Sequence, residues 1–150
     1  MKIIKYSRVH RLSFKKLNEE WLEKYFNVEP YDSTLLENCE SEIINKGGYI
    51  FFGIIDNEVM GTYALLPPVN GRTELGKMAV TESYQGKGYG QQLLKHALST
   101  AKSLGIKEIF LFSNRILKNS IYIYKKFGFK EVENVDSPYK RGNIKMLAKL

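Results

Sequence analysis

A cluster of glycines directly before a strong helical pattern is the feature that most restricts the fold of this chain. From Gln91 to Leu104, leucine and alanine recur at helical spacing, and Gly105 follows as a C-cap. Upstream of the glycines, Thr73 to Val80 is predicted to be a strand. The first-turn amides of a helix have no helical partners, and the helix dipole adds positive charge there. A glycine loop between this strand and this helix therefore predicts an anion site that fits a pyrophosphate.

The spacing within this loop separates three kinds of phosphate site. A P-loop needs Gly-Lys followed by Ser or Thr, but Gly86-Lys87 is followed by Gly88. A dinucleotide-binding fingerprint needs its third glycine one residue later than Gly90. The loop does satisfy the pattern Gln-x-x-Gly-x-Gly, formed by Gln85, Gly88 and Gly90. A plain glycine-rich turn is the alternative.

The rest of the pattern predicts an α+β chain with a mixed sheet. Apolar residues at a period of 3.6 indicate helices, and short β-branched and aromatic runs between turn residues indicate strands. The predicted strands are Lys2–Tyr6, Tyr49–Ile55, Val59–Leu66, Thr73–Val80, Ile109–Phe112, Phe129–Glu133 and Asn143–Leu150. The predicted helices are Ser13–Phe26, Ser33–Ile44, Gln91–Leu104 and Asn119–Phe127. The second to fourth strands are expected to form an antiparallel meander, and one strand-helix-strand crossover follows it.

The glycine motif resembles the pyrophosphate loop of GNAT acetyltransferases, and the resemblance covers nearly the whole chain. Glu74 to Val80 is similar to the central strand of the family, and Phe14 to Phe26 resembles the first helix of bacterial members. Tyr124 to Phe129, Tyr-Lys-Lys-Phe-Gly-Phe, resembles the family pattern Tyr-x-x-x-Gly-Phe. The resemblance implies a single GNAT-like domain over residues 1–150, with a mostly antiparallel central sheet flanked by helices. It also implies direct transfer of an acetyl group from acetyl-CoA to a primary amine.

The resemblance further assigns the residues expected to hold acetyl-CoA. The pantetheine arm would pair with the backbone of the central strand, where that strand splays from the one over 109–113. The expected contacts are Met78, Ala79, Val80, Gln85, Gly86, Lys87, Gly88, Tyr89, Gly90, Asn114 and Asn119. Many relatives have an asparagine seven residues before the tyrosine, but this chain has Leu117 there, so Asn114 or Asn119 is expected to replace it. Asn119 is equally suited to be the N-cap of its helix.

Two side chains are candidates for the chemistry of transfer. The attacking amine must be uncharged, and the leaving thiolate needs a proton. A tyrosine is protonated at neutral pH, so Tyr124 is expected to protonate the sulfur; the alternative is a core residue with its hydroxyl satisfied. Glu74 is expected to deprotonate the acceptor, directly or through water; the alternative is an exposed strand residue paired with a lysine. A backbone amide of Met78 or Val80 would polarise the thioester carbonyl.

The first helix is expected to border the acceptor site. The family resemblance places Trp21, Tyr25, Phe26 and Glu29 beside the acceptor, although an aromatic helix face packed on the core explains them equally well. The sequence does not name the acceptor, which is expected to be a small-molecule or protein amine. Whether the chain forms a homodimer is left open.

The composition limits the classes of partner. A net charge of +7 raises the question of nucleic acid, yet the basic residues are spread among sixteen acidic ones and no nucleic-acid motif is present. The lone Cys39, and the lack of a signal peptide or membrane-length apolar run, predict a cytoplasmic protein without a membrane partner. His10 and His96 have no partners at metal spacing, so no metal is expected. A non-catalytic acyl-CoA-binding module and a basic nucleic-acid-binding domain are the competing functions.

Overall fold

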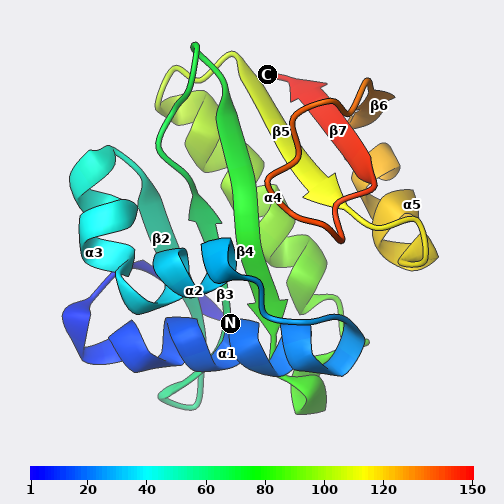
Figure 1. Ribbon diagram of the computed structural model, residues 1–150. Helices are drawn as coiled ribbons and strands as arrows, with labels where there is room; N and C mark the ends of the chain where they lie inside the picture. Colours follow the sequence, from blue (N-terminus) through cyan, green and yellow to red (C-terminus); the bar gives the residue numbers. More distant parts are fainter.

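The computed structural model describes residues 1–150 and contains one seven-stranded sheet in the order β1-β2-β3-β4-β5-β7-β6 (Figure 1). Its strands are β1 Lys2–Lys5, β2 Tyr49–Ile55, β3 Glu58–Leu65, β4 Thr73–Val80, β5 Glu108–Ser113, β6 Lys130–Val132 and β7 Ile144–Lys149. The α-helices are α1 Arg11–Tyr25, α2 Pro30–Glu37, α3 Cys39–Glu42, α4 Tyr89–Ser103 and α5 Lys118–Lys126. All neighbouring strands are antiparallel except β4 and β5, which are parallel and joined through α4. The predicted mixed, mostly antiparallel sheet with one crossover is therefore confirmed.

Alternation along β2 and β3 gives the sheet an apolar surface on both faces. Phe51 and Tyr63 belong to a core shared with α4, and α5 packs on the same core. Phe52 and Ala64 belong to a second core, formed with α1, α2 and α3. Figure 1 shows α1 and α2 in front of the sheet and α4 behind it. The longest helices have 15 residues, and none combines the length and apolar character needed to cross a bilayer.

The region predicted as one helix from Ser33 to Ile44 is two helices, so that prediction was wrong. The first helix starts at Pro30 because Glu29 and Asp32 form a reciprocal capping box, with proline at the first helical position. It ends at Asn38, whose backbone leaves the helical region and whose side chain bonds the Thr34 carbonyl. The early start at Pro30 places Asp32 within the first turn of α2.

The start of α5 also differs from the expected one. The N-cap is Leu117, and Asn119 lies inside the first turn, so the alternative in which Asn119 is the N-cap was wrong. The side chain of Asn114 stabilises the turn before the helix, because its Oδ1 accepts a hydrogen bond from the Ile116 amide. Asn119 is thereby free of a capping role.

The central strands separate part of the way along the sheet. β4 pairs with β5 only at Thr73–Ile109 and Glu74–Phe110, and the two strands then diverge. On its other side, the register of β4 against β3 shifts at Lys77, which has a φ of 52°. A left-handed backbone costs a non-glycine residue about 1–2 kcal/mol, so tertiary contacts must hold this bulge. The opening between β4 and β5 is the predicted splay.

Candidate active site

Two adjoining cavities lie where β4 and β5 diverge. The larger cavity, about 720 Å³, extends from the strand to the glycine loop, and the smaller cavity, about 100 Å³, lies between β4, α1 and the segment 139–142. Both are bordered by the same five residues, namely Trp21, Met78, Leu117, Ser120 and Tyr124. Tyr124 therefore stands at the junction of the two spaces.

The glycine loop presents unpaired amides to the larger cavity. No backbone N–H from Gly86 to Gln91 donates a hydrogen bond within the protein. Gly86 and Gly88 have φ values of 76° and 86°, and Gly88 is the N-cap of α4. Left-handed backbone of this kind favours glycine, and it turns successive amides toward one side. The loop thus has the donors and the helix dipole of an anion site.

Most of the residues predicted to hold a cofactor border this cavity. Those that do are Met78, Ala79, Val80, Gln85, Gly86, Gly88, Gly90 and Asn119. Gln85 stabilises the conformation of the loop. Its Nε2 donates to the Val80 carbonyl at 2.9 Å and so connects the loop to the end of β4.

Three predicted residues lie outside the lining of the larger cavity. The Lys87 ammonium sits 5.7 Å from the centroid of the Tyr84 ring, and the Tyr89 ring contacts the same tyrosine. Asn114 borders the smaller cavity instead, with its Nδ2 donating to the Arg141 carbonyl at 2.8 Å. Its amide is thus already committed to the protein at both ends.

Glu74 lies in the wall of the smaller cavity, so its exposed, lysine-paired alternative was wrong. The Tyr139 hydroxyl donates to its carboxyl at 3.2 Å, and no lysine or arginine forms an ion pair with it. Burial raises the pKa of Glu74 to about 7, against the lowering effects of the Lys77 charge, the Tyr139 hydrogen bond, and the Arg141 and Lys145 charges. The carboxyl can therefore take up and release a proton near neutral pH.

Tyr124 combines a packed ring with a free hydroxyl. The ring meets Phe129 edge-on at 5.9 Å and packs against the core. The hydroxyl makes no hydrogen bond within the protein and is not fully enclosed, so it faces cavity space. Burial raises the pKa of Tyr124 to about 12, which keeps its proton on the oxygen at neutral pH. The hydroxyl can donate to a molecule bound at the junction.

A buried ion network that was not predicted from the sequence supports the smaller cavity. Asp32 is fully buried, and its carboxylate accepts from Lys77 and, through both oxygens, from Arg141. Glu29 also accepts from the Arg141 guanidinium, at 3.1 Å. Burial opposes ionisation, but the Arg141 hydrogen bonds and the Lys77 charge outweigh it and lower the pKa of Asp32 to about 2. One carboxylate therefore joins α2, the bulge of β4 and the segment before β7.

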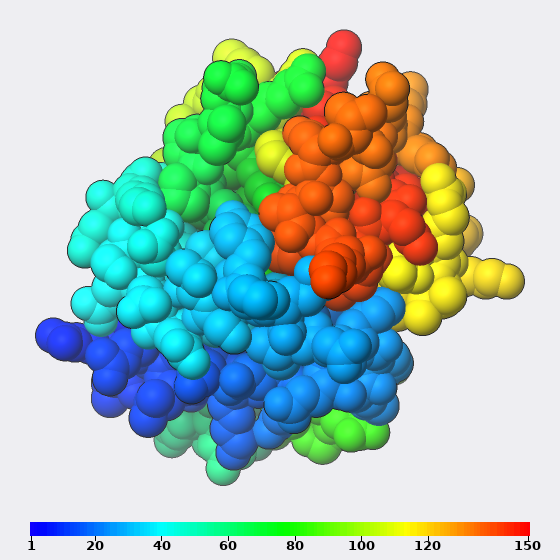
Figure 2. Space-filling view, in the orientation of Figure 1, coloured from blue at the N-terminus to red at the C-terminus, as the bar shows by residue number.

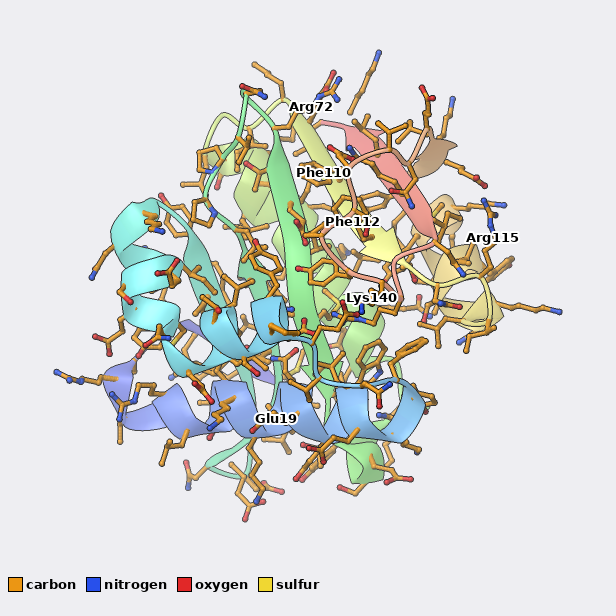
Figure 3. All side chains as sticks on the ribbon, in the orientation of Figure 1. Glu19, Arg72, Phe110, Phe112, Arg115 and Lys140 are labelled. Carbon is orange, nitrogen blue, oxygen red and sulfur yellow. The ribbon has the colours of Figure 1, made fainter.

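The segment between β6 and β7 closes the cavity. Its residues pack over the start of α2, where Figure 2 shows the orange segment against light blue. Tyr139 contributes its ring, which lies 6.0 Å from that of Phe112, a residue that projects from β5 in Figure 3. Trp21 and Phe26 also line the smaller cavity, and Tyr25 borders the larger one. Glu29 borders neither cavity, and its carboxylate holds Arg141 and the Lys140 amide.

Only part of this network had a local signal in the sequence. The motif Glu29-Pro30-x-Asp32 carries the signature of a helix start, which would have placed Asp32 in a first turn. Nothing local pairs Asp32 with Lys77 or Arg141, because 45 and 109 residues separate them along the chain.

Comparisons with known proteins find relatives of this chain. The family model described as the acetyltransferase (GNAT) family matches residues 13–129. An uncharacterised N-acetyltransferase of Bacillus subtilis, YvbK, is 30% identical over 116 residues, which are 75% of this chain and 74% of that protein. A [ribosomal protein bS18]-alanine N-acetyltransferase of Haemophilus influenzae is 26% identical over 127 residues, covering 85% and 82% of the two chains.

Solved structures share the fold. An acetyltransferase of the GNAT family from Staphylococcus aureus has a TM-score of 0.87 at 24% identity and covers 99% of this chain and 98% of its own. The PaiA N-acetyltransferase of Thermoplasma acidophilum, solved in complex with coenzyme A, has a TM-score of 0.76 at 23% identity with the same coverage.

Proposed function

The chain belongs to the GNAT family of acetyltransferases, and we propose that residues 1–150 form one catalytic domain that moves the acetyl group of acetyl-CoA to a primary amine. The observation that carries the proposal is the row of free amides from Gly86 to Gln91, which opens into a cavity ending at the Tyr124 hydroxyl. An anion site at one end and a proton donor at the other match the two ends of a thioester of CoA.

The larger cavity is the proposed site of CoA. The loop 86–91 would hold the pyrophosphate, and the edge of β4 beyond Glu74, which has no strand partner on the β5 side, would pair with the pantetheine amides. Asn119 lines the same cavity and supplies a polar side chain in place of the asparagine that Leu117 replaces. Lys87 adds positive charge near the loop.

In the proposed transfer step, Glu74 and Tyr124 each handle one proton. The amine nitrogen attacks the carbonyl carbon of the thioester, the new N–C bond forms, and the C–S bond breaks. Glu74 accepts the proton that the nitrogen loses on attack, directly or through water, and Tyr124 gives its proton to the departing sulfur. An acceptor that arrives as an ammonium ion first releases one further proton to solvent. The products are the N-acetylated amine and the thiol of CoA. Glu74 then returns its proton to solvent, and Tyr124 regains one.

The acceptor is proposed as a small-molecule or protein amine. The Haemophilus influenzae relative is named for an alanine of ribosomal protein bS18, which makes a protein amine one candidate for this chain. The scaffold alone does not choose between the two sources.

The proposed function is tested by release of free thiol from acetyl-CoA over a panel of amines, with mass spectrometry of the product. In the same experiment, Gly88→Glu should lower CoA affinity at least tenfold, about 1.4 kcal/mol, because a carboxylate at the loop repels the pyrophosphate. Isothermal titration calorimetry measures the affinity.

Gly105→Glu is the matched control for this variant. Gly105 follows the opposite end of α4, has a φ of 79°, and would give a new Cβ as much open space as Gly88 would. It therefore carries the same backbone strain and the same charge change away from the loop. Equal CoA affinity in the two variants would show that the loop does not bind the pyrophosphate.

A second prediction concerns Glu74. In wild-type protein, kcat/KM should rise with pH through about 7 as the Glu74 carboxyl ionises, since the base must be unprotonated to accept the proton of the amine. Glu74→Gln should remove this step and lower turnover most near neutral pH, leaving only the rise from the ionisation of the acceptor. The measurement is a pH-rate profile of both proteins at saturating acetyl-CoA.

The charged groups facing Glu74 decide how this profile is interpreted. Burial lowers the pKa of Arg141, but its hydrogen bonds to Asp32 and the Asp32 charge outweigh this and raise it, and burial raises the pKa of Tyr139, so neither of these groups supplies the step. Burial lowers the pKa of Lys77, against the charge of Asp32 and its hydrogen bond, and the Glu74→Gln variant separates a step of Lys77 from one of Glu74. A Glu74→Gln profile that keeps the same step near pH 7 would exclude Glu74 as the base.

A further inference from the structure

The cations in the wall of the smaller cavity are already neutralised. Lys77 and Arg141 border the cavity, with side-chain exposures of 3% and 15%. Asp32 binds both of them, and Glu29 binds Arg141 a second time. Two positive and two negative charges therefore cancel. A carboxylate on an acceptor would find no free cation here, and it would lie near two existing carboxylates.

Glu74 is the acidic side chain of this cavity that forms no ion pair. It borders the cavity, and its hydrogen bond comes from the neutral hydroxyl of Tyr139. The third nearby cation, Lys145, is held by Asp136 at 3.0 Å. Counted with Asp32 and Glu29, which pair with the two lining cations but do not line the cavity, these groups sum to zero or to a negative charge, depending on the state of Glu74. Such a wall favours an acceptor that arrives as an ammonium ion.

Five aromatic side chains contribute to the rest of the wall. Its rings belong to Trp21, Phe26, Phe112, Tyr124 and Tyr139. Ring faces attract cations, and they offer a methylene chain an apolar surface. The volume of about 100 Å³ is smaller than the cavity of about 150 Å³ that accommodates benzene in a protein core. An unbranched chain of a few atoms fits this space better than a ring or a branched carbon.

We propose that the smaller cavity selects a primary amine at the end of an unbranched alkyl chain that carries no free carboxylate. Such acceptors are cationic aliphatic amines, either free or as the side chain of a lysine in a peptide. The proposal rests on the proposed acetyl transfer and names the class of acceptor for that reaction.

The test compares two acceptors that differ by one carboxylate, 1,5-diaminopentane and free lysine. Both carry a primary amine at the end of the same five-carbon chain. The diamine should have a kcat/KM at least about tenfold higher than lysine, and calorimetry should show tighter binding of the diamine to the CoA-bound protein. Equal values, or a preference for lysine in both measurements, would overturn the proposal.

Two peptides identify the source of the amine. One has a blocked N-terminus and an internal lysine, and the other begins with a free alanine amine. Acetylation of the lysine peptide at a higher rate than the diamine would assign the acceptor to a protein side chain, and a lower rate would assign it to a free amine. A preference for the alanine peptide, whose amine sits on a branched carbon, would contradict the proposal.

The Glu29→Gln variant tests whether the ion network causes the preference for the diamine over lysine. The change removes one of the two carboxylates on Arg141 while leaving Asp32 in place, so the fold should be retained. The preference for diamine over lysine should narrow several-fold, because Arg141 gains a share of free positive charge. Glu108→Gln is the control, since it breaks the Arg72–Glu108 ion pair, which borders neither cavity. An unchanged ratio in Glu29→Gln would overturn the role of the network.

These results are separable from failure of the proposed function. If no amine releases thiol and CoA does not bind, acetyl transfer itself is wrong. If thiol is released and lysine matches the diamine, acetyl transfer stands and only the acceptor class is wrong.

Discussion

Tyr124→Phe should lower turnover by about 10²-fold or more while leaving CoA affinity nearly unchanged. The phenylalanine keeps the ring that packs against Phe129, so the fold and the cavity walls should persist. What is lost is the Tyr124 hydroxyl, which lies at the junction of the two cavities and makes no hydrogen bond within the protein. Since burial holds the pKa of Tyr124 at about 12, the wild-type hydroxyl is protonated throughout the working range of pH. The thiolate of the variant must then take its proton from water.

Tyr122→Phe is the matched control for this change. Tyr122 lies two residues away on α5, but its side chain is exposed and borders neither cavity. It should retain normal turnover. The measurement is the single-turnover rate with saturating acetyl-CoA and acceptor, which isolates the chemical step. A near-normal single-turnover rate in Tyr124→Phe would return Tyr124 to a packing role.

The parts of the fold that follow local rules were predictable from the sequence. β4 was predicted with its observed bounds, and the glycine loop was predicted at the N-terminus of α4, because period, turn residues and caps lie within a few positions of one another. The order of the central strands followed from short connections and one crossover. The errors at α2 and Asn119 came from capping interactions, where Asp32 and Asn114 each act on a backbone amide two or three residues away.

The acceptor side of the site was less predictable for a physical reason. Its wall is assembled from α1, β4 and the segment before β7, and a charge in one of these segments gives no sign of its partner in another. The bulge at Lys77 illustrates the difficulty, since a lysine within a strand pattern gives no indication of a φ of 52°. The partner of its side chain, Asp32, lies 45 residues away along the chain. Glu74 could be proposed from the family pattern, but its burial could not.

Replacing Asp32 should have the largest effect on stability of any single change to the site. Asp32→Asn keeps the shape of the side chain but removes the charge shared by two buried cations, Lys77 and Arg141. An uncompensated buried charge costs about 3–5 kcal/mol in the free energy of unfolding. The strained backbone at Lys77 would also lose its anchor. Urea denaturation at pH 7 measures the loss, and Glu108→Gln, which breaks a more exposed ion pair, should cost only about 0–1 kcal/mol.

The pH dependence separates this charge effect from a loss of packing. The pKa of Asp32 is lowered to about 2 in the folded protein, from an ordinary value of 3.8. A lowered carboxyl pKa contributes stability that is fully present above the ordinary value and is lost as the pH falls through the folded value. The deficit of Asp32→Asn should therefore stay constant from pH 7 to about 4 and shrink toward pH 2, where the wild-type carboxylate also becomes neutral. A deficit that is equal at pH 7 and pH 2 would assign the loss to packing, and a deficit no larger than that of Glu108→Gln would show that the network does not hold the site together.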